Sequence, residues 1–460
     1  MRAYFYANKE VRTIELYKIM DSITDGTVDF DLNIVEHNSL LQVLYNYSKA
    51  EKELYKQMYD YYKGDTDAIK NYKMVTERSN LKTNVNYLKK FIKEEVSYAV
   101  GNPLTYDSDD RDISNTLIYN MQHWDENHDE DLMKYMLIFT KVYELYSINK
   151  AGEFCSDIIT PLQGYSYCDK RGNPIIFIHE WANKLDTTQV YVDVYTRKHI
   201  YHLDGSLNER EEKTIHKFGE VPISVGLLTK EGIEDSLFKD VKGLQDALET
   251  NLSDVGNEIA DFRNAYLLFK GCTIDKEGLE KAKKLGIMQT GDPKSSIEWL
   301  IKNINDTFIQ NALDRYVDTL YQITCHINHN EKLQSNTSSL ALRSRLIALE
   351  QKCTLNINSH KNVVKKRIRL LCNYLNKKAT NKSAYDNKRI IIKYTPNIPQ
   401  DDLMMAQTIS QLADGTISKQ TARGQFSFIN NPSKEGELCE AEAEKELEMI
   451  GDTYAKPAED

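Results

Sequence analysis

The sequence has no stretch of about 18 uncharged apolar residues, roughly the minimum for a membrane-spanning helix. The first residues, Met1-Arg2-Ala3-Tyr4-Phe5, are not followed by the apolar core and small-residue cleavage site of a secretory signal. Seven cysteines are scattered through the chain, odd in number and never spaced as CxxC, which favours reduced thiols and argues against a disulfide framework. We therefore expect a protein of a cytosolic setting that is neither secreted nor membrane-spanning.

The strong motifs of enzyme active sites are also missing. There is no GxxxxGK(S/T) phosphate loop, no GxGxxG after a strand, no HExxH and no GxSxG. The nearest approach to a metal site is Cys325-His326-Ile327-Asn328-His329, but this single cluster falls at a predicted helix end and has no second cluster beside it in the sequence. We therefore expect no enzyme, no catalytic residue, no metal and no cofactor.

Proline is scarce, with nine residues in the chain, and none interrupts the most regular apolar pattern. That pattern predicts one helix over residues 233–262, with apolar residues spaced by threes and fours. At 1.5 Å per residue, roughly 30 residues span ~45 Å, longer than most globular cores need. A second amphipathic helix is predicted over 306–328, where Asp306 offers an N-cap. The segment between them, 263–305, has the pattern of a miniature α/β module, so the three parts form a stalk with a knob.

The rest of the chain indicates an α+β protein that is predominantly helical. A chain of 460 residues exceeds what one core usually supports, so we predict more than one domain. Residues 1–80 are polar and rich in tyrosine and resemble an arm more than a core. Helices are predicted over 81–100 and 131–148. Short β-rich runs follow between residues 154 and 218, with turn signals between them that antiparallel hairpins require.

The C-terminal part begins with a polar loop. Residues 329–339 lack apolar periodicity, and a long helix is predicted over 340–378. A strand follows at 389–394, and helices are expected from 403 onward. The last of them, over 435–448, is highly acidic.

Charge is unevenly distributed around a net charge of −10. Acids outnumber bases on the first long helix, and Glu249, Asp254 and Asp314 are our candidates for an acidic lining that would limit adhesion of DNA. Residues 340–382 instead carry eleven bases against one glutamate. These bases could neutralise phosphates or could pair with acidic neighbours. The candidates that we single out on this basic helix are Arg343, Arg345, Lys365 and Arg369.

Five stretches, in this order and spacing, resemble the portal proteins of tailed bacteriophages, in particular the portal family of phages that infect Gram-positive hosts. Each stretch alone is moderately specific, and their order is more so. The stretches are Asn84–Tyr106 (NVNYLKKFIKEEVSYAVGNPLTY), His216–Ile223 (HKFGEVPI), Gly232–Gly271, Ala282–Ile309 and Asn336–Cys353 (NTSSLALRSRLIALEQKC).

The resemblance implies the portal fold, with named parts that assemble as a ring around a central channel. It implies an N-terminal arm (1–80), a wing (81–232 and 379–400), stem helices (233–262 and 306–328), a clip (263–305), a tunnel loop (329–339), a bent helix joining channel to wing (340–378), and a crown with an acidic tail (401–460).

The resemblance also implies a function. Twelve subunits would form a homo-oligomer at one capsid vertex of the virion, assembled in the host cytoplasm, as the head-tail connector through which double-stranded DNA is packaged and ejected. The terminase large subunit, then a head–tail adaptor, and the major capsid and scaffold proteins would be its partners, without a membrane. In the tunnel loop, Lys332, Gln334, Asn336 and Ser338 would contact the DNA backbone without sequence preference.

Two other hypotheses stay open from the sequence. One is a cytosolic helical adaptor that binds nucleic acid through 340–382 and forms no channel. The weaker one is a metal-dependent nuclease that uses Cys325, His326 and His329.

Overall fold

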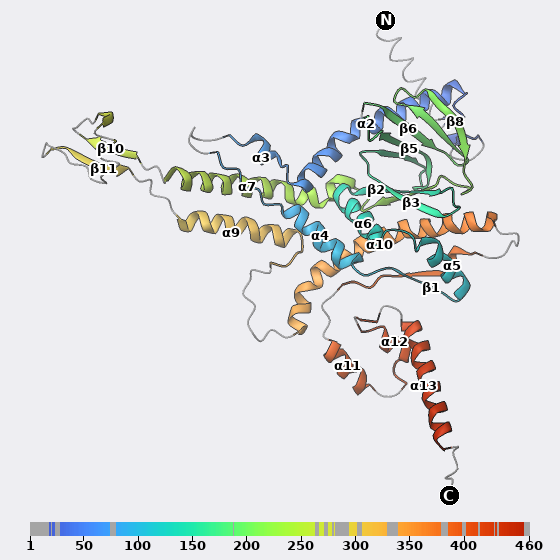
Figure 1. Cartoon of the computed structure of the whole chain (residues 1–460). Helices are drawn as coiled ribbons and strands as arrows, with labels where there is room; N and C mark the ends of the chain where they lie inside the picture. The colour runs from blue at the N-terminus through green and yellow to red at the C-terminus, as the bar shows by residue number, and fades with distance from the viewer. Residues whose placement is uncertain are drawn as a thin grey trace. The chain divides into compact units, whose positions relative to one another are not determined.

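The structure is a computed structural model. The residues that it describes are 18–19, 21–23, 28–73, 80–186, 188–262, 266–270, 275–277, 280, 294–300, 306–328, 339–378, 385–397, 402–412, 415–426, 428–429 and 432–454. The chain forms two compact units: a larger unit of residues 1–53, 93–232 and 332–460, and a smaller unit of residues 54–92 and 233–331. Figure 1 labels the elements of both.

Among the described residues, the strands of the larger unit form three antiparallel sheets. One has five strands in the order β4-β5-β6-β7-β8, one has three in the order β3-β2-β9, and the third pairs β1 with β12. The strands are β1 Thr105–Ser108, β2 Lys141–Ile148, β3 Phe154–Ile159, β4 Gly164–Cys168, β5 Pro174–Ala182, β6 Val190–Tyr195, β7 His199–Asp204, β8 Glu209–Ile215, β9 Ile223–Leu227 and β12 Ile390–Lys393.

The helices of the larger unit lie before, between and after these strands in the sequence. Within the larger unit lie α5 Arg111–Met121, α6 His128–Phe139, α10 Ser339–Lys378, η2 Asn387–Arg389, α11 Asp402–Gln411, α12 Lys419–Arg423 and α13 Pro432–Tyr454. Two further helices, α2 Val35–Lys63 and α4 Tyr87–Val100, begin in one unit and end in the other.

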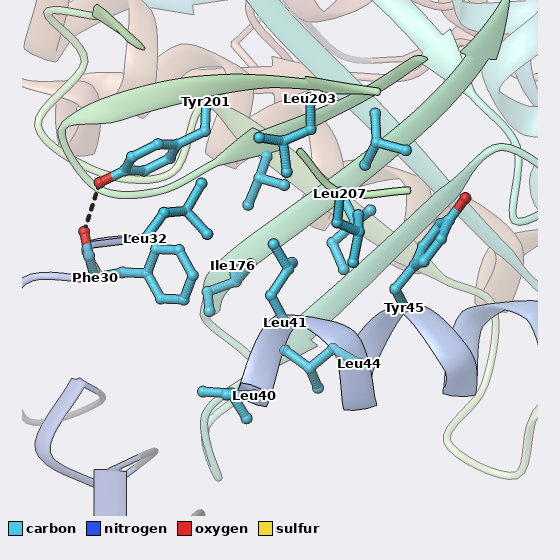
Figure 2. Close-up of a cluster of buried hydrophobic side chains, with 13 residues drawn as sticks. Phe30, Leu32, Leu40, Leu41, Leu44, Tyr45, Ile176, Tyr201, Leu203 and Leu207 are labelled. Carbon is cyan, nitrogen blue, oxygen red and sulfur yellow. Dashed lines mark hydrogen bonds between the residues drawn. The ribbon is translucent and has the colours of Figure 1, made fainter. Parts of the chain in front are cut away.

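The first half of α2 covers one face of the five-stranded sheet. Its residues Leu40, Leu41, Leu44 and Tyr45 are buried against apolar side chains of β5, β6 and β7 (Figure 2). Upstream, the Tyr201 hydroxyl donates a hydrogen bond to the Phe30 carbonyl at 2.8 Å. The expectation that residues 1–80 form an arm without a core is therefore wrong for this part of the segment. The cause is that the apolar positions of α2 pack on strand residues that lie far ahead in the sequence, from Ile176 onward, 131 positions after Tyr45.

The 40-residue helix α10 packs on the three-stranded sheet through β9. Gly226 of β9 allows this close approach, because a Cβ there would lie 2.8 Å from Val142 Cγ1 and 3.0 Å from Val363 Cγ2. Ser224 Oγ, also on β9, donates to the Val363 carbonyl at 3.1 Å. Where the sequence predicts one helix over 340–378, the structure has one over Ser339–Lys378.

One predicted helix is partly a strand. Residues 131–148 were expected to be helical, but α6 ends at Phe139 and β2 begins at Lys141. The turn between them is Thr140, whose φ of 60° is left-handed and breaks the helix. Residues 142–146 are then buried continuously in the middle strand of a sheet, so they lack the alternation that would have identified a strand from sequence.

The smaller unit is built on two long helices. They are α7 Leu237–Phe262, preceded by the short 3₁₀ helix η1 Gly232–Asp235, and α9 Asp306–Ile323. These helices pack against each other, and Figure 1 shows them running side by side. Between them in sequence, β10 Tyr266–Lys270 and β11 Ser296–Leu300 form an antiparallel pair. The short helix α3 Asp67–Asn71 packs on α7.

The ends of the two long helices differ from the predicted ones for local reasons. The first begins at Leu237 instead of residue 233, where Ser236 Oγ accepts a hydrogen bond from the Lys239 amide at 3.1 Å. The second ends at Ile323 instead of residue 328, because Cys325 adopts a φ of 62° and the His326 amide turns back to the Tyr321 carbonyl at 3.0 Å. Much of the segment predicted as a miniature α/β module, 263–305, lies outside the described residues.

Among the described residues, none of the helices combines the length and the apolar character needed to cross a lipid bilayer.

Candidate functional site: the paired helices and the basic helix

A segment of the smaller unit, residues 81–88, lies along α7 and is held there by side chains of that helix; it is extended up to residue 86 and enters α4 at Tyr87. We call this segment the strap. Four of its backbone amides donate hydrogen bonds to four α7 side chains, one from each successive turn. The pairs are Leu81 N with Asn257 Oδ1 at 2.6 Å, Thr83 N with Ser253 Oγ at 2.9 Å, Val85 N with Glu249 Oε1 at 3.1 Å, and Leu88 N with Gln245 Oε1 at 3.2 Å.

The match between strap and helix follows from backbone geometry. Positions four apart on a helix are separated by about 6 Å along its axis, and positions two apart in an extended chain by about 6.6 Å. Acceptors at 257, 253 and 249 therefore meet amides at 81, 83 and 85 almost in register. Backbone amides of an extended segment need hydrogen-bond acceptors, which a neighbouring strand usually provides. Here polar side chains on one face of α7 are the acceptors.

A second group of contacts joins α7 to residues just before the strap. Lys242 Nζ lies 2.8 Å from Asp67 Oδ2 and 2.9 Å from Asp246 Oδ2. The Tyr61 hydroxyl donates to Asp246 at 2.8 Å, and the Lys242 ammonium donates to the Tyr61 oxygen at 2.7 Å. Burial, together with the hydrogen bond and the charge of Asp246, raises the pKa of Tyr61 well above its ordinary value.

These contacts change the account of the acidic candidates. Glu249 is completely buried, where it accepts hydrogen bonds from Thr66 Oγ1 and the Val85 amide, and burial raises its pKa. Asp254 is half-buried and accepts a hydrogen bond from the Tyr72 hydroxyl at 2.7 Å. The expectation that Glu249 lines an open surface is thus wrong within the protomer. Asp314 of α9 is exposed, and its carboxylate accepts a hydrogen bond from Gln310 at 2.8 Å.

The basic candidates of α10 fall into three groups. Lys365 is exposed to solvent. Arg369 is partly exposed and lies 2.5 Å from Glu220 Oε2, the carboxylate that also binds Lys366. Arg343 and Arg345 belong to α10, but their side chains are outside the described residues. The loop candidates Lys332, Gln334, Asn336 and Ser338 also lie outside them.

A buried ionic cluster in the larger unit was not anticipated. The guanidinium of Arg367 on α10 is 2.8 Å from Glu144 Oε1 on β2 and 2.7 Å from Asp129 Oδ1 on α6. Arg367 and Glu144 have almost no exposed surface. His128 Nε2 lies 2.9 Å from the same Glu144 oxygen, and the imidazole of His360 borders the cluster, 4.0 Å from Asp129.

The electrostatics of this cluster follow from its contacts. Burial alone would raise the pKa of Glu144, but the charge of Arg367 and the hydrogen bond from His128 outweigh it and lower the pKa from 4.5 to about 2. Arg367 could have been suspected from sequence, because it follows Val363 by four positions and Val364 by three, on the buried stripe of α10.

The Cys325–His329 segment has a structural explanation for its best-placed member. His326 is buried, its ring is stacked on Phe91 with centroids 4.3 Å apart, and its Nε2 lies 3.2 Å from the Phe91 carbonyl oxygen. His329 lies outside the described residues. In the described part of the chain, no three His, Cys, Asp or Glu side chains are grouped so that they could hold a metal ion.

In both units the buried polar side chains fasten segments of the chain to one another, as in a structural protein. Residues 41–449 match the model of a family described as phage portal protein, SPP1 Gp6-like. Because the match covers most of the chain, the protein belongs to this family of phage portal proteins. The portal protein of Bacillus phage SPP1 is 23% identical over 490 aligned positions, which cover 98% of this chain and 94% of that protein.

Two solved structures are similar at lower levels. One is from the neck of an empty GTA particle computed with C6 symmetry, with a TM-score of 0.46 and 9% identity, covering 74% of this chain and 89% of the other. The second is from the virion of a native gene transfer agent particle, with a TM-score of 0.43 and 11% identity, covering 73% of this chain and 88% of the other.

Proposed function

We propose that this protein forms a ring of twelve subunits at one vertex of a phage capsid and serves as the conduit for double-stranded DNA during packaging and ejection. The observation that carries the proposal is the family match over residues 41–449. The pair of long helices α7 and α9 is consistent with it, because helices of this length can stand side by side around an axis.

The parts of the chain then take the roles of a portal subunit. Helices α7 and α9 form the stem, the segment between them with β10 and β11 forms the clip, residues 329–339 form the tunnel loop, and α10 joins the channel to the wing. The sheets of residues 105–227 with β12 form the wing, and residues 401–460 form the crown and tail. The burial of Leu40, Leu41 and Leu44 on the five-stranded sheet adds the first half of α2 to the wing.

The proposed partners follow from the same roles. The clip would dock the terminase large subunit during packaging and a head–tail adaptor afterwards, while the major capsid and scaffold proteins would surround the ring during assembly in the host cytoplasm. We assign no catalytic residue to this chain, so the motor protein would supply ATP hydrolysis. The tunnel loop would contact the DNA backbone through charge and hydrogen bonds.

The rival hypothesis, a channel-free adaptor that binds nucleic acid through its basic helix, has less support. Several bases of that helix are engaged by acids of their own protomer: Lys352 by Glu95 at 2.8 Å, and Arg367 by two buried carboxylates. Paired bases contribute little to phosphate binding, which favours the structural interpretation of this helix.

Mass measurement combined with negative-stain imaging tests the proposal. Twelve subunits of 53.2 kDa give about 640 kDa, and we expect rings with a central hole at that mass. Because some portals need assembly partners, the chain should be expressed both alone and with the scaffold and capsid proteins of its own phage. A protein that remains monomeric or dimeric in both preparations, or that incorporates into capsids at many sites, would refute it.

A further inference from the structure

The strongest unassigned feature is a cluster of cations around Gly219 and Glu220, in the loop between β8 and β9 of the larger unit. Arg197 Nε donates a hydrogen bond to the Gly219 carbonyl at 3.3 Å. Lys377 approaches the same residue, since a Cβ on Gly219 would lie 3.0 Å from its Nζ. Glu220, the next residue, binds Lys366 and Arg369 of α10. Four cations thus converge on two consecutive residues.

These charges are only partly neutralised. Glu220 accounts for Lys366 and Arg369, and its pKa is lowered because those two cations outweigh the cost of its burial. In the described part of the chain, neither Arg197 nor Lys377 has a carboxylate within 4.0 Å. Both side chains are exposed. The four cations and Glu220 therefore sum to a net positive charge on a protein whose overall charge is −10; Asp29 and Asp169 line the same pocket as Arg197, and Asp29 is paired with Lys198.

The backbone beneath the cations is unusually open. Gly219 has a φ of 80°, so its left-handed conformation favours glycine, and within 4 Å a Cβ there would meet only the side chain of Lys377. Gly152, also left-handed, lies below Lys378, with 4.0 Å between its hypothetical Cβ and the ammonium. Lys217 is exposed two residues before Gly219.

We propose that this surface, defined by Arg197, Lys217, Lys377 and Lys378, binds the phosphate backbone of duplex DNA outside the channel. The inference rests on the proposed function, which brings duplex DNA to this protein. Exposed lysine and arginine side chains bind phosphates by releasing counterions and do not read sequence, so the contact tolerates any DNA that lies against the larger unit. An acidic protein segment is the competing occupant that the experiment must distinguish.

The test uses a covalently closed circular duplex, because a closed circle cannot thread through a preformed ring and so reports only outer surfaces. Binding of the labelled circle to the purified assembled protein is measured by filter binding from about 0.05 to 0.3 M salt. The test variant is Arg197→Gln with Lys377→Gln. The control is Lys184→Gln with Lys230→Gln, which removes the same charge from exposed lysines of the same unit.

Each phosphate contact contributes about 0.9 to the slope of log K against log salt concentration, so losing two contacts should make this slope shallower by about 1.8. If the variant and the wild type bind equally at 1 M salt by extrapolation, the variant should bind about 60-fold more weakly at 0.1 M salt. The control variant should bind as the wild type does. Equal binding by the test variant and the wild type would overturn the proposal. The proposal would also be overturned if the wild type bound a peptide of the acidic residues 435–448 and the test variant lost binding of this peptide but not of the circular DNA.

Failure of this inference is distinguishable from failure of the proposed function. Ring formation and mass are measured on the same samples, and neither variant changes a residue of α7, α9 or the strap. If both variants form normal rings but bind the circular DNA equally well, only the surface proposed here is refuted.

Discussion

Replacing Arg367 with methionine should destabilise the larger unit more than any other single charge removal on α10. The substitution keeps a long unbranched side chain but leaves Glu144 buried without its guanidinium partner, and it removes the 2.7 Å contact to Asp129. Removing one partner from a buried ion pair typically costs about 3–5 kcal/mol, because the remaining charge stays desolvated. For a unit of residues 1–53, 93–232 and 332–460, that loss lowers the melting temperature by about 4 to 7 °C.

The pH dependence gives a second reading of the same contact. The pKa of Glu144 is depressed from 4.5 to about 2, so its contribution is present in full above pH 4.5 and is lost as the pH falls towards 2. A shift of that size corresponds to about 3 kcal/mol. The difference in unfolding free energy between the wild type and Arg367→Met should therefore be largest near neutral pH and should narrow on acidification.

Urea unfolding at fixed protein concentration, at pH 7 and pH 3, measures both effects, since oligomers change stability with concentration. Arg369→Met is the matched control, because Arg369 is partly exposed and Glu220 keeps Lys366, so its loss should cost less than about 1 kcal/mol. If Arg367→Met is as stable as Arg369→Met at pH 7, the buried cluster does not hold α10 to the sheet and the reasoning fails.

Three further outcomes are expected. Asn257→Ala removes the acceptor of the Leu81 amide and the donor to the Leu81 carbonyl, and should lower the free energy of unfolding by about 1–3 kcal/mol. The control Asn251→Ala, on the exposed face of α7, should lower it by less than about 1 kcal/mol. Equal losses in thermal unfolding would contradict the claim that these hydrogen bonds hold the strap to α7. Asp314→Lys should fold normally, because Asp314 is exposed, and should slow DNA packaging if α9 faces the channel. Glu249→Lys should fail to fold, because Glu249 is completely buried. An unchanged packaging rate for Asp314→Lys in well-formed rings would argue against the idea that acidic side chains limit adhesion of DNA to the channel. Burial lowers the pKa of His360, so below about pH 6.5 the unfolded chain binds a proton at this histidine more readily than the folded chain does. The free energy of unfolding of the wild type should therefore fall between about pH 6.5 and 5. Urea unfolding should show a smaller fall for His360→Gln.

The elements with a clear period in the sequence were the easiest to predict. The two long helices and α10 have apolar residues at helical spacing over many turns, and the structure contains helices at Leu237–Phe262, Asp306–Ile323 and Ser339–Lys378. The paired strands at residues 266–270 and 296–300 lie within the segment predicted as a miniature α/β module. Local patterns were sufficient in these cases because the same periodicity determines both the fold and the burial.

The failures arose where a distant segment decides the role of a residue. Nothing adjacent to Glu249 in sequence shows that its carboxylate receives the amide of Val85, 164 positions earlier, so its charge alone suggested an exposed acid. Likewise, Arg367 resembles the other bases of a basic helix until β2 and α6 place two carboxylates against it. In β2, continuous burial removed the alternation that would have separated a strand from the preceding helix.

The strap has a mechanical consequence. Its four hydrogen bonds are spaced along α7 at one-turn intervals and run across the gap between strap and helix. A force that pulls α7 along its own axis therefore shears all four bonds together, whereas a force that lifts one end of the strap breaks them in succession. A single-residue insertion within α7 would rotate the downstream acceptors by about 100° and uncouple them from the strap. The resistance of the contact between strap and α7 to such a force thus depends on keeping the number of residues between Gln245 and Asn257 unchanged.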